Sequence, residues 1–312
     1  MTDLTTTRLN HLVDPTLHVW AWQIPVYLFL GGLVAGMMAI SGVWLMRGRR
    51  AQPGSVMFAL PLLSLVLLSL GMLALFLDLE HKLYVWRLYT TFEWRSPMSW
   101  GAWILVAVYP ALVIMLMLHP PAWLGAAVPM LTRWSAQLQM WPTVARRIGM
   151  VSVVLGGMLG IYTGVLLSTL AARPAWNSAL LGPLFLTSGL SSAAALVHLI
   201  ARRPDESHEL VRVDNWFLQA ELAMLVLMLI GLTTSTRAHA LGAALFLGGP
   251  YTAVLWVGVV GIGILLPLTV QMLMVRHRVP HTALAPALVL AGGVLLRFVM
   301  VSAGQVSHWR SF

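Results

Sequence analysis

The sequence predicts an all-α integral membrane protein with eight transmembrane helices. Of its 312 residues, 59% are hydrophobic and only 9% are charged, whereas about a quarter of the residues of a soluble domain are charged. The apolar residues form long stretches, and each is long enough to cross about 30 Å of hydrocarbon as a helix. This composition excludes a soluble globular enzyme and a disordered or fibrous protein.

The expected spans follow in order from these stretches, because a helix satisfies its own backbone hydrogen bonds in lipid. They are residues 22–46, 56–79, 98–118, 149–171, 179–201, 215–235, 251–275 and 282–304. The first apolar stretch is a full span without a small-residue cleavage site, so we expect helix one to be retained.

The long connections lie on either side of the third span, an outer loop of residues 79–97 and an inner loop of residues 119–148. We therefore divide the single membrane domain into residues 1–148, with helices one to three, and residues 149–312, with helices four to eight.

A weak internal repeat relates the two halves of the protein. Leu28-Phe29-Leu30 near the start of span one matches Leu184-Phe185-Leu186 near the start of span five, and Ser96-Pro97 matches Gly249-Pro250. Both offsets are near 155 residues, about four spans. The repeat predicts two four-helix bundles of parallel topology, over about residues 20–171 and 179–304. Chance similarity between apolar stretches is the alternative.

The distribution of basic residues predicts the orientation. The loops after spans one, three, five and seven carry 11 arginines, and the termini and other loops carry seven lysines and arginines. Because basic loops favour the cytoplasm, both termini are expected outside it. The 11 arginines are Arg47, Arg49, Arg50, Arg133, Arg146, Arg147, Arg202, Arg203, Arg212, Arg276 and Arg278.

The composition also limits cofactors and partners. The sequence has no cysteine, which excludes disulfides and cysteine-ligated iron–sulfur clusters within it. Its histidines lie in loops, tails or span ends, with His198 alone clearly inside a span, so we expect no membrane haem, and no zinc spacing indicates a metal site. The net charge of +9 indicates loops that face an anionic membrane surface rather than nucleic-acid binding.

Five polar side chains in or near the spans are functional candidates, because such groups are costly in lipid. Asp78, Tyr162, Arg297 and His18 fall toward the outer side, and Glu221 lies nearer the inner side. Asp78 alternatively caps a helix or pairs with Lys82. We expect Arg297 to neutralise Asp78 or to snorkel outward. An ordinary core tyrosine and an interfacial histidine are the alternatives for Tyr162 and His18.

Glycines recur at every fourth position in two spans. Gly32 and Gly36 share one face of span one, and Gly156, Gly160 and Gly164 share one face of span four. Such stripes let helices approach closely in lipid, and packing is the simpler interpretation. The functional alternative is that a flat ring enters the groove beside them.

Four stretches in and beside the first four spans occur together in a known family. They are Trp20-Ala-Trp22 running into Tyr27-Leu-Phe-Leu-Gly-Gly-Leu-Val-Ala-Gly36; Asp78-Leu79; Ser96-Pro-Met-Ser-Trp-Gly101; and Tyr162-Thr-Gly-Val-Leu-Leu-Ser168 followed by Arg173-Pro-Ala-Trp176. Together they resemble the NrfD/polysulfide reductase membrane-subunit family. The Ser-Pro-Met-Ser-Trp-Gly stretch is the most specific signal.

The resemblance implies a haem-free subunit of a prokaryotic cytoplasmic (inner) membrane. It implies that menaquinone or ubiquinone binds near the extracytoplasmic side and exchanges electrons with an iron–sulfur subunit there. That partner connects to a catalytic subunit, often a molybdopterin enzyme. Carried over by motif, Tyr162 matches a tyrosine that hydrogen-bonds quinone, Asp78 an acidic residue ending helix two, and His18 a polar position before helix one. Trp22 and Gly32 complete the expected quinone-binding set.

Quinol oxidation releases two electrons and two protons, so the site needs an apolar slot, hydrogen-bond donors and a proton acceptor. We expect Tyr162 and His18 to be donors and Asp78, tuned by Arg297, to accept protons. Glu221, Thr163 and Ser192 are candidates for an inner-side proton path.

Partner docking is expected on the outer loop, which carries Lys82, Arg87 and Arg95. This loop departs from the family, because Glu80-His81-Lys82 follows Asp78-Leu79 where relatives often have Gly-Arg-Pro. Two other functions stay open, a secondary transporter and a passive membrane anchor. A transporter is expected to have broken helices and a polar solute site near the midplane.

Overall fold

The computed structural model describes residues 20–49, 52, 54–170, 172–275 and 283–308, and within these ranges every regular element is helical. Among these residues, eight helices are long and apolar enough to cross a membrane, which confirms the predicted fold class. They are α1 (Gln23–Met46), α2 (Leu60–Asp78), α4 (Pro97–Leu118), α7 (Pro142–Ser168), α8 (Leu181–Ile200), α9 (Pro204–Thr234), the π-helix η3 (Val254–Leu265) continuing into α11 (Leu266–Val275), and α12 (Leu284–Val306).

Most of these helices begin and end within about four residues of the expected spans, and α7 and α9 are the exceptions. They begin at Pro142 and Pro204, well before the expected residues 149 and 215. A proline suits the first turn of a helix, where its missing N–H has no intrahelical partner. Hydropathy locates the apolar part of a helix and misses polar turns outside the hydrocarbon. The division drawn at residue 148 therefore falls inside α7.

The connections contain short helices where the sequence predicts loops. The segment 79–97 forms η2 (Lys82–Tyr84) and α3 (Arg87–Thr90), and 119–148 forms α5 (Ala122–Ala127) and α6 (Pro129–Gln139). Ser135 and Gln139 of α6 both donate hydrogen bonds to the carbonyl of Leu118, at 2.7 and 2.9 Å. They satisfy a carbonyl that the end of α4 leaves without an intrahelical partner. The remaining short elements are η1 (Val56–Phe58) and α10 (Arg237–Ala244).

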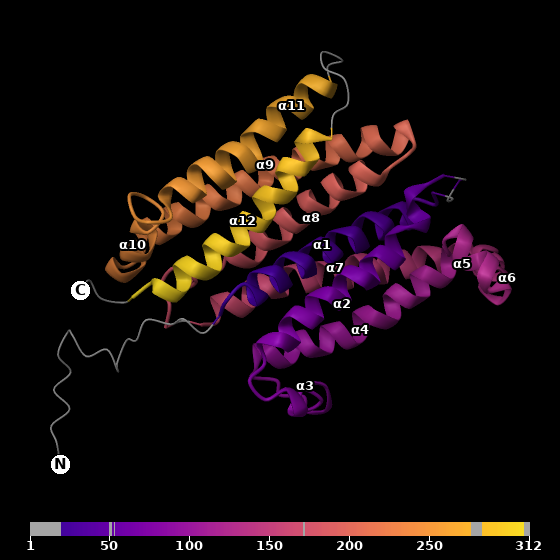
Figure 1. Cartoon of the computed structure of the whole chain (residues 1–312), viewed down its shortest axis with the longest axis horizontal. Helices are drawn as coiled ribbons and strands as arrows, with labels where there is room; N and C mark the ends of the chain where they lie inside the picture. The colour runs from indigo at the N-terminus through magenta and orange to yellow at the C-terminus, as the bar shows by residue number, and fades with distance from the viewer. Residues whose placement is uncertain (1–19, 50–51, 53, 171, 276–282, 309–312) are drawn as a thin grey trace.

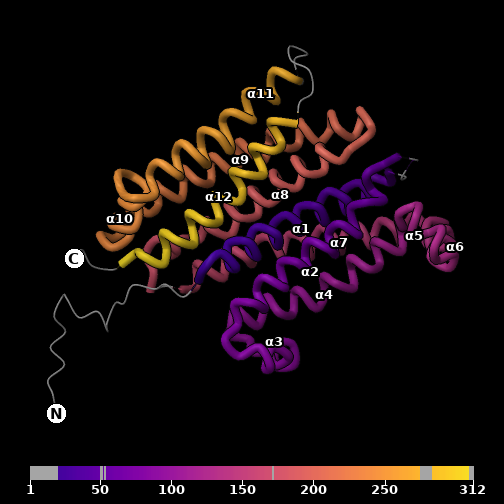
Figure 2. Tube along the Cα trace, in the orientation of Figure 1, coloured from indigo at the N-terminus to yellow at the C-terminus, as the bar shows by residue number. Residues whose placement is uncertain are grey.

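The long helices form two groups that lie side by side (Figures 1 and 2). Helices α1, α2, α4 and α7 contact one another in a ring, and so do α8, α9, η3–α11 and α12. Helix α1 also packs on α8 and α12, and α7 packs on α8. The order of neighbours is the same in both groups, which supports the proposed repeat; the repeat itself stays a prediction.

Glycines bring α1 close to its neighbours. A Cβ atom added to Gly36 would lie 2.6 Å from the carbonyl oxygen of Gly189, and one added to Gly156 would lie 2.7 Å from that of Ala35. Larger side chains would separate these backbones. The stripes on α1 and α7 therefore serve helix packing, as the simpler interpretation predicts.

The two ends of the bundle differ in chemistry. The arginine-rich end, where α1 ends and α9 begins, carries Arg47, Arg49, Arg133, Arg146, Arg147, Arg202, Arg203 and Arg212. The opposite end carries residues 79–97, and we call it the 79–97 end.

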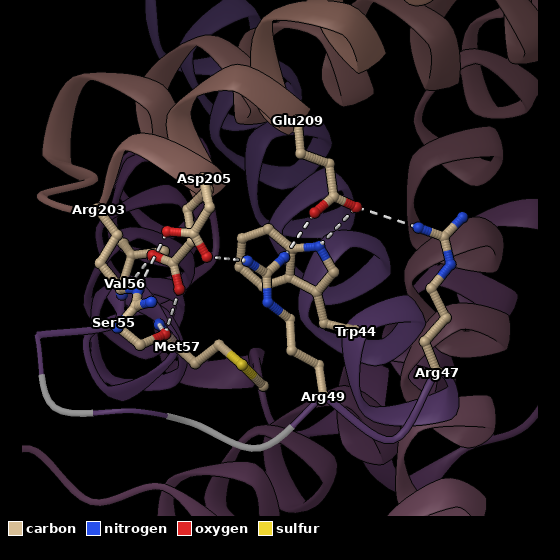
Figure 3. Close-up of polar contacts among 10 residues, drawn as sticks. Trp44, Arg47, Arg49, Ser55, Val56, Met57, Arg203, Asp205 and Glu209 are labelled. Carbon is tan, nitrogen blue, oxygen red and sulfur yellow. Dashed lines mark hydrogen bonds and ion pairs between the residues drawn. The ribbon is translucent and has the colours of Figure 1, made fainter.

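At the arginine-rich end an ion network joins α1 to α9 (Figure 3). Arg49 donates to Asp205 at 3.1 Å and to Glu209 at 2.5 Å, and Arg47 donates to Glu209 at 3.0 Å. The Trp44 indole also donates to Glu209. This network ties the two helix groups together.

Candidate functional site

A cavity of about 360 Å³ lies at the 79–97 end, among α1, α2, α4 and α7. Its size is at the lower end of the range for small-molecule sites. Four tyrosines, a glutamate and a histidine are its polar lining residues, and leucines form much of the rest. These residues include Tyr27, Tyr84, Tyr89, Tyr162, Glu80, His81, Leu75, Leu105 and Leu166. We call this cavity the tyrosine pocket.

Tyr162 of α7 is 7% exposed, and its ring lies against Gly101 of α4. A Cβ atom at Gly101 would overlap Cζ and the hydroxyl oxygen of Tyr162. Pro97 starts α4, and Met98, Gly101 and Ala102 of its first two turns line the pocket. The most specific sequence stretch therefore forms the wall against which the tyrosine lies.

Three further tyrosines, Tyr27, Tyr84 and Tyr89, line the pocket, and the sequence did not predict any of them. Tyr27 of α1 is buried, and Tyr89 of α3 is half-buried. Burial, followed by the nearby Tyr109, raises the pKa of Tyr89, so its hydroxyl stays protonated and can donate a hydrogen bond. Tyr27 stands at the start of a stretch that the family shares, which was a usable signal. Tyr89 gave none, because it sits in a segment predicted to be a plain loop.

The other described residues of the expected quinone-binding set do not line this pocket. Asp78 ends α2 directly before Leu79, which lines the pocket. Trp22 precedes α1 and is 53% exposed. Gly32 lies deeper in α1, where its Cα faces Gly189 of α8 and the guanidinium of Arg297. His18 lies outside the described residues.

A second polar cluster lies inside the other helix group. Arg297 of α12 is fully buried, and its Nη1 and Nη2 atoms donate to the Ser188 hydroxyl at 2.7 Å and the Phe185 carbonyl at 2.8 Å. Its guanidinium also stacks on the Phe185 ring, 4.4 Å from the centroid. Glu221 of α9 interacts with Ser188 and electrostatically with Arg297. The buried carboxyl group of Glu221 and the buried guanidinium of Arg297 thus lie near each other, at a similar depth in the bundle.

This arrangement corrects the expectation that Arg297 neutralises Asp78 or snorkels outward. Arg297 lies nine residues before the end of α12, about 14 Å along the helix axis. Helix α12 packs on α8, α1 and η3, so its guanidinium reaches Ser188 and Phe185 of α8. Asp78 belongs to the other helix group.

Asp214 extends the cluster toward the arginine-rich end. It lies on α9 two turns before Glu221 and is 1% exposed. Its carboxylate accepts hydrogen bonds from Ser191 of α8 and Gln271 of α11, both at 2.7 Å. The sequence did not point to Asp214, because it lies one residue before the expected span. We call Asp214, Ser188, Ser191, Glu221 and Arg297 the α9 polar cluster.

The two hydroxyl residues named as relays lie nearby with other partners. Thr163 of α7 donates to the carbonyl of Gly160 in its own helix at 2.7 Å. Ser192 of α8 faces Gly293 of α12, while its neighbour Ser191 makes the bond to Asp214. Their proposed role in proton transfer stays a prediction.

The segment 79–97 presents an exposed surface beside the tyrosine pocket. Lys82, Arg87 and Arg95 are all exposed there. Apolar side chains accompany them, with Leu83 88% exposed and Trp94 73% exposed. Exposed apolar residues among polar ones are typical of protein interaction sites. Within the described residues, no group of three or more His, Asp or Glu side chains is placed to hold a metal ion.

Comparisons with known proteins agree with this architecture. Residues 11–308 match the family model "Polysulphide reductase, NrfD". The sequence is 30% identical to the C subunit of the polysulfide reductase of Wolinella succinogenes, covering 92% of this protein and 94% of that one. It is also 30% identical to protein NrfD of Escherichia coli, covering 93% and 96%. A protein NrfD homolog of Haemophilus influenzae is 27% identical, covering 93% and 95%.

Proposed function

The protein belongs to the polysulphide reductase, NrfD family, and we propose that it is the membrane anchor and quinone-binding subunit of a respiratory oxidoreductase. It passes electrons between the quinone pool and an iron–sulfur partner, and the substrate chemistry, often that of a molybdopterin enzyme, takes place in a further subunit. The observation that carries this proposal is the tyrosine pocket. A bound quinone or quinol supplies the two-electron redox chemistry that the protein's own side chains lack.

The residues of the pocket fit a quinone ring. Leu75, Leu105 and Leu166 offer apolar walls to the ring, and hydroxyls of Tyr27 and Tyr162 are available as donors to its oxygens. The wall at Gly101 holds the Tyr162 ring at one position.

The mouth of the pocket carries titratable groups. His81 and Glu80 line it there and can exchange protons with the outside. These are the residues that replace Gly-Arg-Pro of many relatives. Asp78 keeps its proposed role as a proton acceptor, and the role of His18 stays a prediction.

We assign partner docking to the exposed surface of the segment 79–97. Lys82, Arg87 and Arg95 attract an acidic partner face, and Leu83 and Trp94 supply apolar contact area. An iron–sulfur subunit docked there places its nearest cluster close to the tyrosine pocket. We place this face, and both termini, on the extracytoplasmic side of an inner membrane, because the opposite end carries most of the arginines.

The test is quinol turnover by the assembled complex with Tyr162→Phe and Tyr27→Phe, singly and together. Loss of one hydrogen bond to the ring is expected to raise KM for quinol about three- to tenfold. Tyr251→Phe is the matched control, because Tyr251 lies outside the pocket. The proposal is wrong if the double variant keeps the parent KM and turnover. A complex that purifies without quinone and oxidises no quinol would instead support a passive anchor.

A further inference from the structure

A second and larger cavity lies at the arginine-rich end, away from the tyrosine pocket. It has a volume of about 890 Å³ and runs along the first two turns of α2, between α5 and the end of α8. Leu62, Leu63 and Val66 of α2 form one side of it, and Trp123 of α5 stands at another. Val66 is 49% exposed and Trp123 is 65% exposed, so this groove opens sideways from the bundle.

The position of the groove in the bundle indicates where it contacts lipid and where it contacts water. Its apolar side belongs to a membrane-spanning helix, and exposed apolar side chains on such a helix contact lipid. Trp123 stands at the charged end of the bundle, where indole rings are typical of the membrane–water interface. The groove therefore faces lipid along its length and water at one end.

Among the described residues that line the groove, Arg202 is the single charged one. Arg202, directly after α8, is exposed at its rim and makes no ion pair with any described residue. No carboxylate of the described residues lines the groove. The Ser55 hydroxyl, which also lines it, donates its hydrogen to Glu206 at 2.6 Å. An apolar wall with one guanidinium at the interface matches a long apolar tail that carries an anionic head.

We propose that this groove binds one anionic glycerophospholipid, with an acyl tail against α2 and the headgroup phosphate beside Arg202. A quinone is the weaker fit, because no tyrosine is among the described residues that line the groove and the Ser55 hydroxyl already donates to Glu206. The bound lipid fills the space between α2, α5 and α8 at this end. The inference does not depend on the tyrosine pocket.

The experiment measures which lipid the full-length protein, in its complex, retains from mixed micelles of phosphatidylglycerol and phosphatidylcholine, read by native mass spectrometry. The parent protein is expected to retain phosphatidylglycerol in preference, and Arg202→Gln to reduce that adduct about tenfold. Ala59→Phe, which places a ring in the groove, is expected to remove either lipid. Arg146→Gln is the control, because Arg146 is exposed at the same end and lies outside the groove.

Three results would overturn the proposal. They are equal retention of both lipids by the parent protein, an unchanged phosphatidylglycerol adduct in Arg202→Gln, and recovery of quinone as the species displaced by Ala59→Phe. Arg202 is exposed and outside every helix, so its replacement is expected to leave the fold intact even where Ala59→Phe does not.

Discussion

At the scale of single residues, Gly101 shows how an absent side chain sets the geometry of the tyrosine pocket. The Tyr162 ring occupies the space that any Cβ atom at position 101 would need. Tyr162 is therefore positioned by α4 as much as by its own helix α7. The stretch Ser96–Gly101 has two structural roles. It starts α4, and its glycine leaves the space that Tyr162 of α7 occupies.

We predict that Gly101→Ala displaces the Tyr162 ring and weakens quinol oxidation. A displacement of about 1 Å at a reacting group can lower a rate on the order of a hundredfold, so a loss of about ten- to a hundredfold in kcat/KM is expected. The matched control is Gly157→Ala on α7, where an added Cβ atom meets nothing within 4 Å. Steady-state kinetics of the assembled complex measure both. Equal kinetics for the two variants would show that the position of Tyr162 does not matter.

Individual residues also show which parts of the candidate site can be predicted from the sequence. Tyr162 was predicted because it belongs to a motif. Asp214 was missed because it lies one residue before the expected span, and its partners Ser191 and Gln271 stand on other helices. The partner of Arg297 was predicted wrongly for the same reason. Positions along a span give the depth of a residue, whereas the neighbouring helix that it faces depends on three-dimensional packing.

At the scale of elements, α9 explains the largest error in the predicted boundaries. Its 31 residues make a helix of about 46 Å, longer than the roughly 30 Å of hydrocarbon. The extra turns are polar, with Asp205 and Glu206 in the first turn, where acidic groups favour the helix dipole. Glu206 is 1% exposed and accepts hydrogen bonds from the Ser55 hydroxyl at 2.6 Å and the Val56 N–H at 3.1 Å. The start of α9 therefore fixes the connection from α1 to α2.

We predict that Glu206→Ala destabilises the protein by about 2–3 kcal/mol, because it leaves the Val56 N–H and the Ser55 hydroxyl buried without an acceptor. Ser55→Ala is expected to lower stability by about 1 kcal/mol, and the two changes should be coupled by about 0.5–3 kcal/mol in a double-mutant cycle.

The matched control is Asp205→Asn, whose side chain is 54% exposed and whose ion pairs are expected to contribute little to stability, because water screens them. Thermal unfolding in mild detergent at a fixed protein concentration measures all of these variants against the parent. If Glu206→Ala and Asp205→Asn lower the melting temperature equally, the buried bonds of Glu206 are not what holds the connection.

At the scale of the whole molecule, the two polar sites lie in different helix groups and share α1. Tyr27 of α1 lines the tyrosine pocket, and Gly32, five residues further on, faces Arg297 of the α9 polar cluster. Hydropathy predicted the eight helices, and the spacing of the glycines predicted the close packing of α1 and α7. The packing of the two helix groups decides which helices enclose each site. No single stretch of the sequence predicts that packing.

The α9 polar cluster leads from the arginine-rich end to the middle of the bundle, and this placement supports the proposed proton path. Asp214 and Glu221 are buried carboxylates two turns apart on one helix. The Ser191 hydroxyl bonds to Asp214, and Ser188 interacts with Glu221 and Arg297. Buried carboxylates with hydroxyl neighbours are typical of proton relays in membrane proteins. Arg297 is the last residue of the cluster. It lies beside α1, the helix that also lines the tyrosine pocket.

We predict that Glu221→Gln separates electron transfer from proton movement in the complex reconstituted into liposomes. With an uncoupler present, quinol turnover is expected to stay within about twofold of the parent, because Glu221 does not line the tyrosine pocket. Without it, the proton movement per electron, followed with a pH-sensitive dye, is expected to fall by more than about half, since glutamine cannot carry the proton. Asp205→Asn on the same helix is the control and should change neither quantity. Unaltered proton movement in Glu221→Gln would exclude the path, and a parallel loss of turnover and proton movement would assign Glu221 to the support of Arg297 and the packing of α1 instead.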